Sequence, residues 1–591
     1  MACSSTSIVL MSAWLQFALA RELPISTGFV AWRWRPQNKL APYPGTVQQH
    51  DWPIPRQLAS PSTFVARNFS ASESCGRIDS LWNSTYLERT HTTTSSPKMQ
   101  KVIQVPSVDR IALRLMIACM MALAGQLLIV PRTAHAAENP PTGFQVPVGQ
   151  RQLFLDDHGI AQQNNLRRQM HQPEKRGAVI RSPQPNKSIQ TRTAPVWDEK
   201  AGLYKTWVIT VDDNLWQSRD GLNWTPGPKT NMPIMLAVYD PLDPDPERRF
   251  KAPLLNRGFA VSPDGITWKQ LDLKAVPSSD EGNFSFDAEN GLFIHTVKRG
   301  GPHGRALALA TSKDFKTWDD HGIVFQTDEL DQERGKQHIA NRLADATLQQ
   351  PLYNDPSVYN VDVYNMGVFR YEGLYIGLPA LYHAVGPVPN YPNTDGFQLI
   401  QLACSRDLKN WQRLGNRETF IGPSHIDSGA YDLTQLLPPS APIVHDDELW
   451  FYYTGLKWRS NFNYIGTYPD GRIELIPGRD RDGGGICLAV LRRDGFVSLD
   501  AGDEEGQIVT QPFKLSGKNL MINADARNGQ VRVEVLNPQG EVVAAAKNVA
   551  EDSPRKQLQW IQGDLDALQK QTVSLRFKLR NASLFSYWLT D

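Results

Sequence analysis

The chain has 591 residues, of which 41% are hydrophobic and 21% are charged, as in a globular protein with more than one core. Its formal net charge is +1, and the basic residues are scattered along the chain. The charge pattern excludes the basic footprint of a nucleic-acid-binding protein, so nucleic acid is not an expected partner.

The first predicted element is an export signal that lies far from the first residue. A basic segment opens at Met99, an apolar run follows at 115–130, and an Ala-x-Ala cleavage pattern ends at Ala136. The apolar run is shorter than the ~20 residues that a membrane-spanning helix needs. We therefore predict a signal peptide over 99–136, a periplasmic or secreted mature chain, and no stable membrane anchor after cleavage.

Residues 1–98 precede this signal and show no sustained hydrophobic period. A signal peptide works only at the start of a chain. We therefore interpret 1–98 as a mis-assigned upstream extension, and a disordered leader is the alternative.

A short repeat, S-x-D-x-x-x-W, recurs along the mature chain. Four full copies and a degenerate fifth place their aspartates at Asp220, Asp264, Asp314, Asp407 and Asp494. The first two intervals are about 45–50 residues and the last two about twice that, a spacing typical of propeller blades. Each aspartate can accept backbone N–H bonds in an Asx turn, and each tryptophan can return to an apolar interface. We predict a structural role for these markers, because copies arranged round a ring point apart.

Each marker follows a pattern of two β-rich runs joined by a turn. These hairpin patterns lie at 193–209, 234–255, 282–299, 363–383 and 441–455. Five hairpins with five markers predict five blades of about four strands over 137–506. The two wide intervals are predicted to contain loops, at 319–361 and 412–440.

The pattern changes after Gly506 to short alternating runs, which predict a small β-sandwich over 507–591. The predicted fold class is therefore all-β, with a five-bladed β-propeller followed by a C-terminal β-sandwich. Cys404 and Cys487 lie in apolar strand-like runs and are predicted to be buried free thiols rather than a disulfide. Neither has the pattern of a metal ligand, so no metal site is predicted.

The markers and hairpins resemble those of the five-bladed propeller glycoside hydrolases, the group that contains families 32 and 43. Three segments are similar to signatures of an uncharacterised secreted subgroup related to family 32, namely RQLFLDDHGI at 151–160, DVYN at 362–365 and RRDGFVSLDAG at 492–502. This resemblance covers about 138–506 and implies a carbohydrate substrate. The catalytic motifs of family 32 are absent at matching positions, so the resemblance implies a fold more strongly than a reaction.

Candidate site residues come from the geometry of a propeller, whose innermost strands line a channel where ligands bind. Glycoside hydrolysis needs one carboxyl group to protonate the leaving oxygen while another attacks or activates water. We predict as catalytic the carboxylates Asp157, Asp362 and Asp427. We predict as substrate-binding the residues Asp156, Asp280, Arg299, Tyr364 and His383. For each of them the alternative is an ordinary structural role in a turn or on the surface.

Three functions remain open from the sequence. The first is an exported glycosidase that cleaves an oligo- or polysaccharide with paired carboxylates. The second is a glycoside phosphorylase on the same fold, and the third is a non-catalytic carbohydrate-binding propeller. No cofactor is predicted and a monomer is expected. A structural Ca²⁺ in the channel, as in some relatives of family 43, has no support in the residues.

Overall fold

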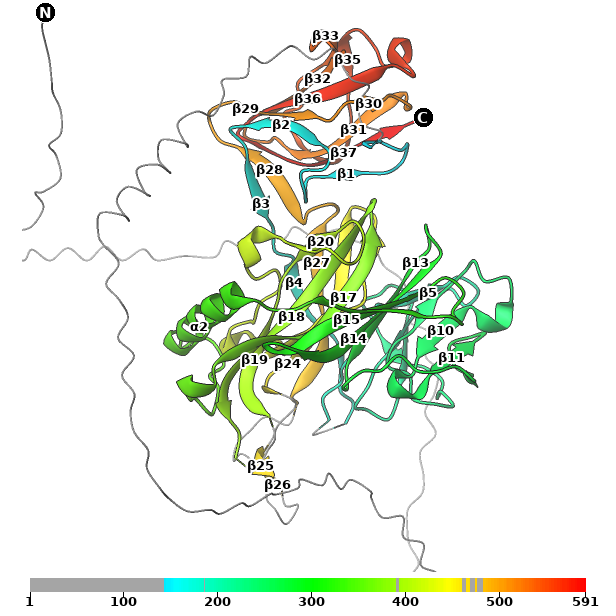
Figure 1. The fold of residues 1–591 in the computed structure, drawn as a ribbon, viewed down its shortest axis with the longest axis vertical. Coiled ribbons are helices and arrows are strands. Elements are labelled where there is room, and N and C mark those ends of the chain that lie inside the picture. Colours follow the sequence, from blue (N-terminus) through cyan, green and yellow to red (C-terminus); the bar gives the residue numbers. More distant parts are fainter. Residues whose placement is uncertain (1–142, 185–186, 390–392, 460–463, 468–472, 476–481) are drawn as a thin grey trace, which may run out of the picture. The chain divides into compact units, whose positions relative to one another are not determined.

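The computed structural model describes residues 143–591 except for 185–186, 390–392, 460–463, 468–472 and 476–481. The predicted extension at 1–98 and the predicted signal peptide at 99–136 lie outside the described residues. The described part is mostly β-structure in antiparallel sheets (Figure 1). Among the described residues, no helix is long and apolar enough to cross a membrane.

Five of the sheets follow one another along the chain and contain the predicted hairpins. The first sheet contains β5 (Val196–Asp198), β6 (Leu203–Trp207), β7 (Leu215–Ser218) and β8 (Thr225–Pro226). The second contains β9 (Val238–Tyr239), β10 (Phe250–Pro253), β11 (Phe259–Ser262) and β12 (Lys269–Leu271). The third contains β13 (Gly282–Asp287), β14 (Leu292–Gly301), β15 (Gly304–Ser312) and β16 (Asp319–Phe325).

The fourth and fifth sheets have longer strands. The fourth contains β17 (Asn360–Tyr371), β18 (Leu374–Pro387), β19 (Thr394–Ile400), β20 (Ala403–Ser405) and β21 (Gln412–Arg413). The fifth contains β22 (Gln435–Leu437), β23 (Ile443–His445), β24 (Glu448–Leu456), β27 (Gly484–Arg492) and β4 (Glu174–Arg181). Each of the five predicted hairpins contains two antiparallel strands, which confirms this part of the sequence analysis. A small two-stranded sheet joins β25 (Tyr464–Thr467) to β26 (Ile473–Leu475).

The four full copies of the repeat form the predicted turns. In the first copy, Asp220 Oδ1 accepts hydrogen bonds from the backbone N–H groups of Leu222 (2.9 Å) and Asn223 (2.8 Å). The Trp224 indole donates to the carbonyl of Gly221 at 2.7 Å, and Gly221 has a φ of 74° that suits glycine. The same carboxylate-to-backbone bonds recur at Asp264, Asp314 and Asp407.

The tryptophan of each copy packs against an aromatic residue of another sheet. The ring centroids are 5.8 Å apart for Trp224 and Tyr452, 5.9 Å for Trp268 and Trp207, 4.7 Å for Trp318 and Phe259, and 6.4 Å for Trp411 and Phe325. Three of these contacts join a sheet to the sheet before it. The contact between Trp224 and Tyr452 instead joins the first sheet to the fifth.

Two further sheets share one hydrophobic core that includes Leu520, Ile522, Val531 and Val533. One contains β1 (Gln152–Leu153), β3 (Arg167–Met170), β28 (Val497–Ala501), β31 (Asn519–Asp525), β34 (Asp552–Gln557) and β37 (Ala582–Thr590). The other contains β2 (Ile160–Asn164), β29 (Gly506–Thr510), β30 (Phe513–Lys514), β32 (Gln530–Leu536), β33 (Val542–Ala546), β35 (Trp560–Gln562) and β36 (Thr572–Arg580). The boundary predicted at 506/507 therefore falls inside β29, and strands from 152–170 join these two sheets.

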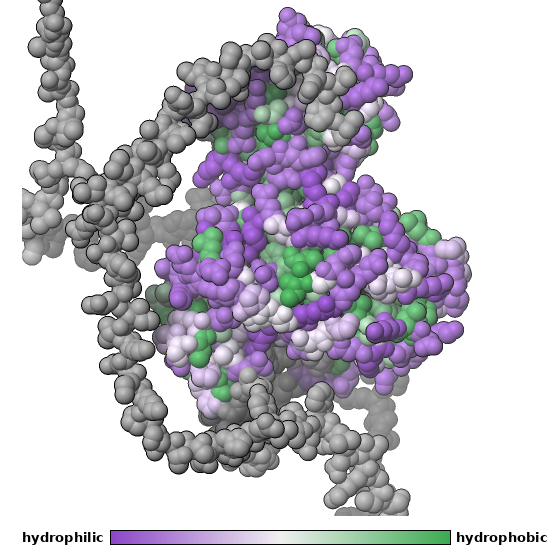
Figure 2. All heavy atoms as spheres, in the orientation of Figure 1, coloured by the Kyte–Doolittle hydropathy of each residue, from purple (hydrophilic) through white to green (hydrophobic). Residues whose placement is uncertain are grey.

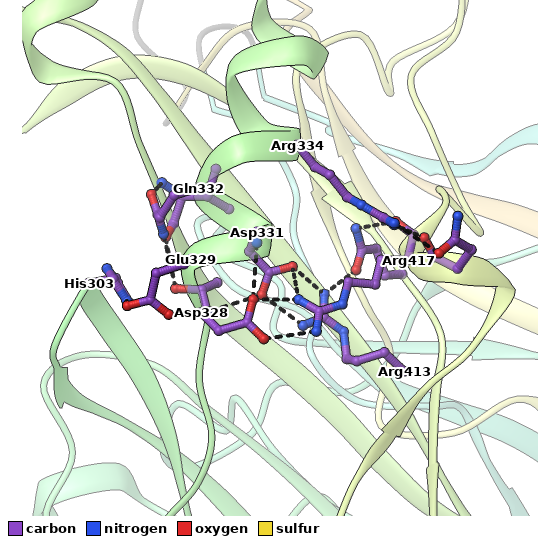
Figure 3. A network of polar contacts seen from close by, with 12 residues as sticks. His303, Asp328, Glu329, Asp331, Gln332, Arg334, Arg413 and Arg417 are labelled. Carbon is purple, nitrogen blue, oxygen red and sulfur yellow. Dashed lines mark hydrogen bonds and ion pairs between the residues drawn. The ribbon is translucent and has the colours of Figure 1, made fainter. Parts of the chain in front are cut away.

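The interval predicted as a loop at 319–361 contains a helix, α2 (Glu329–Ala344), so this prediction was wrong. Its N-terminus has a capping box between Asp328 and Asp331. Figure 3 shows how the two carboxylates meet Arg413 and Arg417, with N–O distances of 2.9 and 2.6 Å. Gly335 lets the helix approach β17, because a Cβ at this position would lie 2.1 Å from a methyl carbon of Val361. The helix therefore covers one face of the fourth sheet.

Short 3₁₀ segments complete the described structure, at Pro246–Arg248, Leu255–Arg257, Pro356–Val358, Gly415–Arg417, Ile426–Ser428 and Asp566–Leu568. Cys404 and Cys487 are both buried free thiols, as predicted. On the face shown in Figure 2, apolar side chains form small patches among hydrophilic ones. Scattered apolar residues of this kind are normal on a protein surface.

Candidate functional site

The candidate site is centred on a β-bulge in β17. The register with β18 pairs Val363 with Leu381 and Asn365 with Ala380, which leaves Tyr364 as the extra residue. A bulge of this kind redirects a side chain and is frequent beside functional sites. The ring of Tyr364 lies 4.2 Å from the Lys298 Nζ and 5.3 Å from the Arg305 guanidinium carbon.

Asp362 lies two residues before Tyr364, and its side chain is buried. The residue is 4% exposed, and its Oδ2 accepts a hydrogen bond of 2.8 Å from Arg305 Nη1. Its Oδ1 is buried and has no hydrogen-bond partner. Burial raises the pKa of Asp362, and this effect outweighs the lowering by Arg305. A buried carboxyl with a raised pKa and an unpaired oxygen has the properties of a general acid.

The turn before Arg305 brings this residue to Asp362. Gly304 has a φ of 108°, and a Cβ on it would lie 2.8 Å from Asp362 Oδ2. Glycine is therefore favoured at position 304 for two reasons: its φ is positive, and a Cβ would collide with the Asp362 carboxylate. The second guanidinium nitrogen, Nη2, donates to Asn393 Oδ1 at 3.1 Å. Arg305 is thus held between the third and fourth sheets.

A second buried group joins three separate parts of the chain. Arg192 lies before β5 and donates two hydrogen bonds to Glu281, from Nε at 2.8 Å and from Nη2 at 2.6 Å. Asn365, the residue after the bulge, donates to Glu281 Oε2 at 3.1 Å. Burial lowers the pKa of Arg192, but the charge of Glu281 outweighs it and the net pKa is raised. This pair is therefore a charge-assisted, bidentate contact.

Tyr364 lies near both groups, because its ring is 5.3 Å from the Arg305 guanidinium carbon and the charge of Glu281 acts on its hydroxyl. Burial and then the charge of Glu281 raise the pKa of Tyr364 to about 12, so its hydroxyl stays neutral and can donate a hydrogen bond. Tyr382 lies beside it with ring centroids 6.3 Å apart, and Arg459 Nε donates to the Tyr382 hydroxyl at 3.1 Å. The site thus combines two carboxyl groups, cationic side chains and two phenols, which suits a polar, hydroxylated ligand.

Asp280, which was predicted to bind substrate, also lies in this region. Asp280, next to Glu281, forms an ion pair with the buried Lys298, although its own side chain is 68% exposed. Burial lowers the pKa of Lys298. The structure thus places Asp280 and Tyr364 beside Lys298, and Asp362 two residues before Tyr364 on β17.

His383 and Arg299 point away from this group. His383 Nε2 lies 3.1 Å from Nδ1 of His338 on α2, and its ring stacks on Phe397 with centroids 4.7 Å apart. Burial lowers the pKa of His383 to about 3, so the ring is neutral. Arg299 forms an ion pair of 2.6 Å with Asp320 near the surface. Both side chains have structural partners where they lie.

The other three predicted carboxylates lie apart from Asp362. Asp157 is 78% exposed and pairs with Arg168 at 2.6 Å. Asp156 pairs with Arg406 at 2.7 Å; burial raises the pKa of Asp156, but the bonds from Arg406 bring it below the usual value. Asp427 lies on an exposed 3₁₀ turn. The structure does not bring these residues to the Tyr364 group.

Four residues of this group were not predicted from the sequence, namely Glu281, Arg192, Lys298 and Arg305. Asp280 was predicted because it is a carboxylate just before a predicted innermost strand, and its neighbour Glu281 has the same position. Sequence alone does not tell which of two adjacent side chains faces inward. Among the residues that the structure describes, no group of three or more His, Cys, Asp or Glu side chains is arranged to hold a metal ion.

Comparisons with known proteins find distant likenesses only. No family model and no curated protein matches the chain. A family 32 β-fructofuranosidase structure from Bombyx mori shares 12% identity over 71% of this chain and 94% of its own, with a TM-score of 0.30. A β-1,2-mannobiose phosphorylase structure from Listeria innocua shares 15% identity over 64% and 89%, with a TM-score of 0.23. At such values the likenesses assign no activity to this chain.

Proposed function

We propose that the protein is an exported glycosidase built on a five-bladed β-propeller with a C-terminal β-sandwich. Two observations support the propeller. The tryptophan contacts run from each sheet to the one before it and from the first sheet to the fifth. The early strand β4 also pairs with β27 at the end of the fifth sheet, which is a way for a propeller to close its ring.

The observation that carries the proposed activity is the state of Asp362. Its burial, raised pKa and unpaired Oδ1 equip it to protonate the oxygen of a glycosidic bond. Glu281 supplies the second carboxylate that this reaction needs, either to attack the anomeric carbon or to activate a water molecule. Arg192 and Asn365 hold Glu281 in place.

Tyr364 and the cations around it complete the proposed site. The neutral Tyr364 hydroxyl can donate to a sugar oxygen, and Arg305 orients Asp362 through its Oδ2 so that Oδ1 remains available. Loss of the proton from Asp362 leaves a carboxylate beside Arg305, and this ion pair stabilises the product state of the proton transfer.

A second candidate is a glycoside phosphorylase. Two cations lie near the Tyr364 ring, with the Lys298 Nζ at 4.2 Å and the Arg305 guanidinium carbon at 5.3 Å from its centroid. A pair of cations of this kind can bind a phosphate group. The phosphorylase needs Asp362 as its acid but does not need Glu281 as a nucleophile or base.

One experiment separates these functions. The full chain is incubated with a panel of oligosaccharides, polysaccharides and aryl glycosides, with and without inorganic phosphate, and the products are identified by mass. Free sugar released without phosphate supports the glycosidase, and sugar phosphate supports the phosphorylase. If nothing is released but sugars bind, the protein is a binding propeller and the proposal is wrong. Asp503→Asn is the control variant, because Asp503 is exposed and was not predicted to belong to the site, so its loss should leave turnover unchanged.

A further inference from the structure

Three adjacent strands place Asp362, Tyr382 and Gln398 in one row. The strands β17, β18 and β19 belong to the fourth sheet (Figure 1). β17 pairs Asp362 with Tyr382 of β18, and β18 pairs Tyr382 with Gln398 of β19. Residues directly opposite each other in antiparallel strands project to the same face of a sheet. The carboxyl and the amide therefore lie on one face, on strands about 10 Å apart, with Tyr382 between them.

Gln398 is buried without any hydrogen bond from its side chain. The residue is 1% exposed, and neither Oε1 nor Nε2 has a partner. Such a group opposes folding, and buried amides in proteins are almost always paired. Asp362 Oδ1 is a second unpaired buried atom in the same row. Tyr382, between them, is not unpaired, because its hydroxyl donates a hydrogen bond to the Thr394 carbonyl at 2.6 Å.

A nearby glutamine shows that the fold can satisfy a buried amide. Gln401 is also buried, but its Nε2 donates to the Arg417 carbonyl at 2.6 Å and its Oε1 accepts from Arg413. Two buried glutamines three residues apart thus have opposite surroundings. The unpaired state of Gln398 is a local property of the face that it shares with Asp362.

We infer that Gln398 is a substrate-binding residue whose amide donates to and accepts from ring hydroxyls of the sugar unit that has its glycosidic oxygen at Asp362. The nature of this ligand rests on the proposed function. A side-chain amide offers two N–H donors and one acceptor oxygen, and neighbouring sugar hydroxyls can meet both kinds. A ligand that lacks the hydroxyl leaves the amide unpaired, and sites of this type reject such analogues strongly.

The first test is the stability of the ligand-free full chain. Gln398→Met keeps the volume and removes the unpaired amide, so the Tm should stay constant or rise. Gln401→Met is the matched control and should lower the Tm by about 2–5 °C. The substitution leaves the Arg417 carbonyl and the Arg413 guanidinium without the hydrogen bonds that Gln401 now makes. A fall in the Gln398→Met variant as large as in the control would show that the fold itself satisfies Gln398, and it would overturn the inference.

The second test uses the aryl glycoside that the panel shows to be cleaved, together with its monodeoxy analogues. Gln398→Met should lower kcat/KM for the parent glycoside about 10- to 100-fold and should abolish the discrimination against one deoxy analogue. Unchanged rates and discrimination, with turnover intact, would overturn the role of Gln398 and leave the proposed function standing.

If no glycoside is cleaved, the same question is answered by binding. Calorimetric titration of a panel of methyl glycosides then compares the wild-type chain with the Gln398→Met variant. Weaker binding by the variant supports Gln398 although the proposed hydrolysis has failed. Equal binding by both proteins, or binding by neither, overturns the inference.

Discussion

At the scale of single residues, Asp362 differs from the other carboxylates of the sequence analysis in what its two oxygens do. One oxygen is held by Arg305 at 2.8 Å and the other is buried and unpaired. Asp157, in contrast, is largely exposed and paired with Arg168. Only the first arrangement keeps a proton at a defined place away from water, which is what general acid catalysis requires.

We expect Asp362→Asn to lower kcat by about 10²- to 10⁴-fold, because an amide cannot transfer the proton. The variant should remain folded, since Asn can still accept from Arg305 through its Oδ1. Steady-state kinetics together with circular dichroism measure the two effects. Retention of activity in a folded variant would remove Asp362 from the proposed mechanism.

The raised pKa of Asp362 also predicts a pH dependence. A general acid works in its protonated form, so kcat/KM should fall as the pH rises through the pKa of Asp362, which burial places above 3.8. The folded state also holds this proton more tightly than the unfolded state. This contribution to stability is therefore present at low pH and is lost as the pH rises through the same window. Comparison of the Tm–pH curves of the wild type and Asp362→Asn isolates it, and coinciding curves would contradict the assignment.

At the scale of elements, the marker turns are local devices that repeat with the same geometry. In the fourth copy, Asp407 Oδ1 accepts from the backbone N–H groups of Lys409 (2.9 Å) and Asn410 (2.7 Å). The backbone bond from Asn410 is the largest of the effects that lower the pKa of Asp407 to about 2, and the side-chain bond from Asn410 and the backbone bond from Lys409 add to it. The turn thus stabilises the ionised carboxylate, and the carboxylate stabilises the turn.

We expect Asp407→Ala to lower the free energy of unfolding by about 0.5–2 kcal/mol, as for the loss of a helix cap, without changing activity. Asp407→Asn keeps an acceptor oxygen and should lose less. The folded-state pKa is below the unfolded value of 3.8, so this stabilisation is present above about pH 4 and is lost as the pH falls toward 2. Urea unfolding at pH 7 and pH 3 measures both effects. A loss of turnover in Asp407→Ala at full stability would instead indicate a catalytic marker.

At the scale of the whole described region, Asp494 of the fifth marker has a different structural role from the aspartates of the other four markers. Asp494 is fully buried and accepts from Arg151 at 2.6 Å, from the Tyr371 hydroxyl at 2.6 Å and from Ser586 at 2.5 Å. These partners come from the first described segment, the fourth sheet and the last strand. Asp494 therefore joins segments that lie far apart in the sequence.

We expect Asp494→Ala to destabilise the protein by about 3–5 kcal/mol, because it leaves the Arg151 charge buried without its partner. Asp503→Ala, at an exposed position, should change the stability by less than about 0.5 kcal/mol and is the control. Chemical unfolding monitored by tryptophan fluorescence compares the two. Equal midpoints for both variants would show that the buried pair contributes nothing.

Local sequence was sufficient for the features whose partners lie within a few residues. The Asx turns and the five hairpins involve contacts between residues close along the chain, so Asp, Gly, Trp and alternating runs could predict them. Burial of Cys404 and Cys487 followed in the same way from the apolar runs around them.

The candidate site depended on pairings that link distant parts of the chain. The bulge at Tyr364 sets which neighbours face inward, and it appears only in the register of β17 with β18. Glu281 rather than Asp280 meets Arg192. His383 turns toward α2 because it lies next to Tyr382 on a strand, where successive side chains point to opposite faces. These choices follow from strand register and from packing between sheets, which residue types along one segment do not encode.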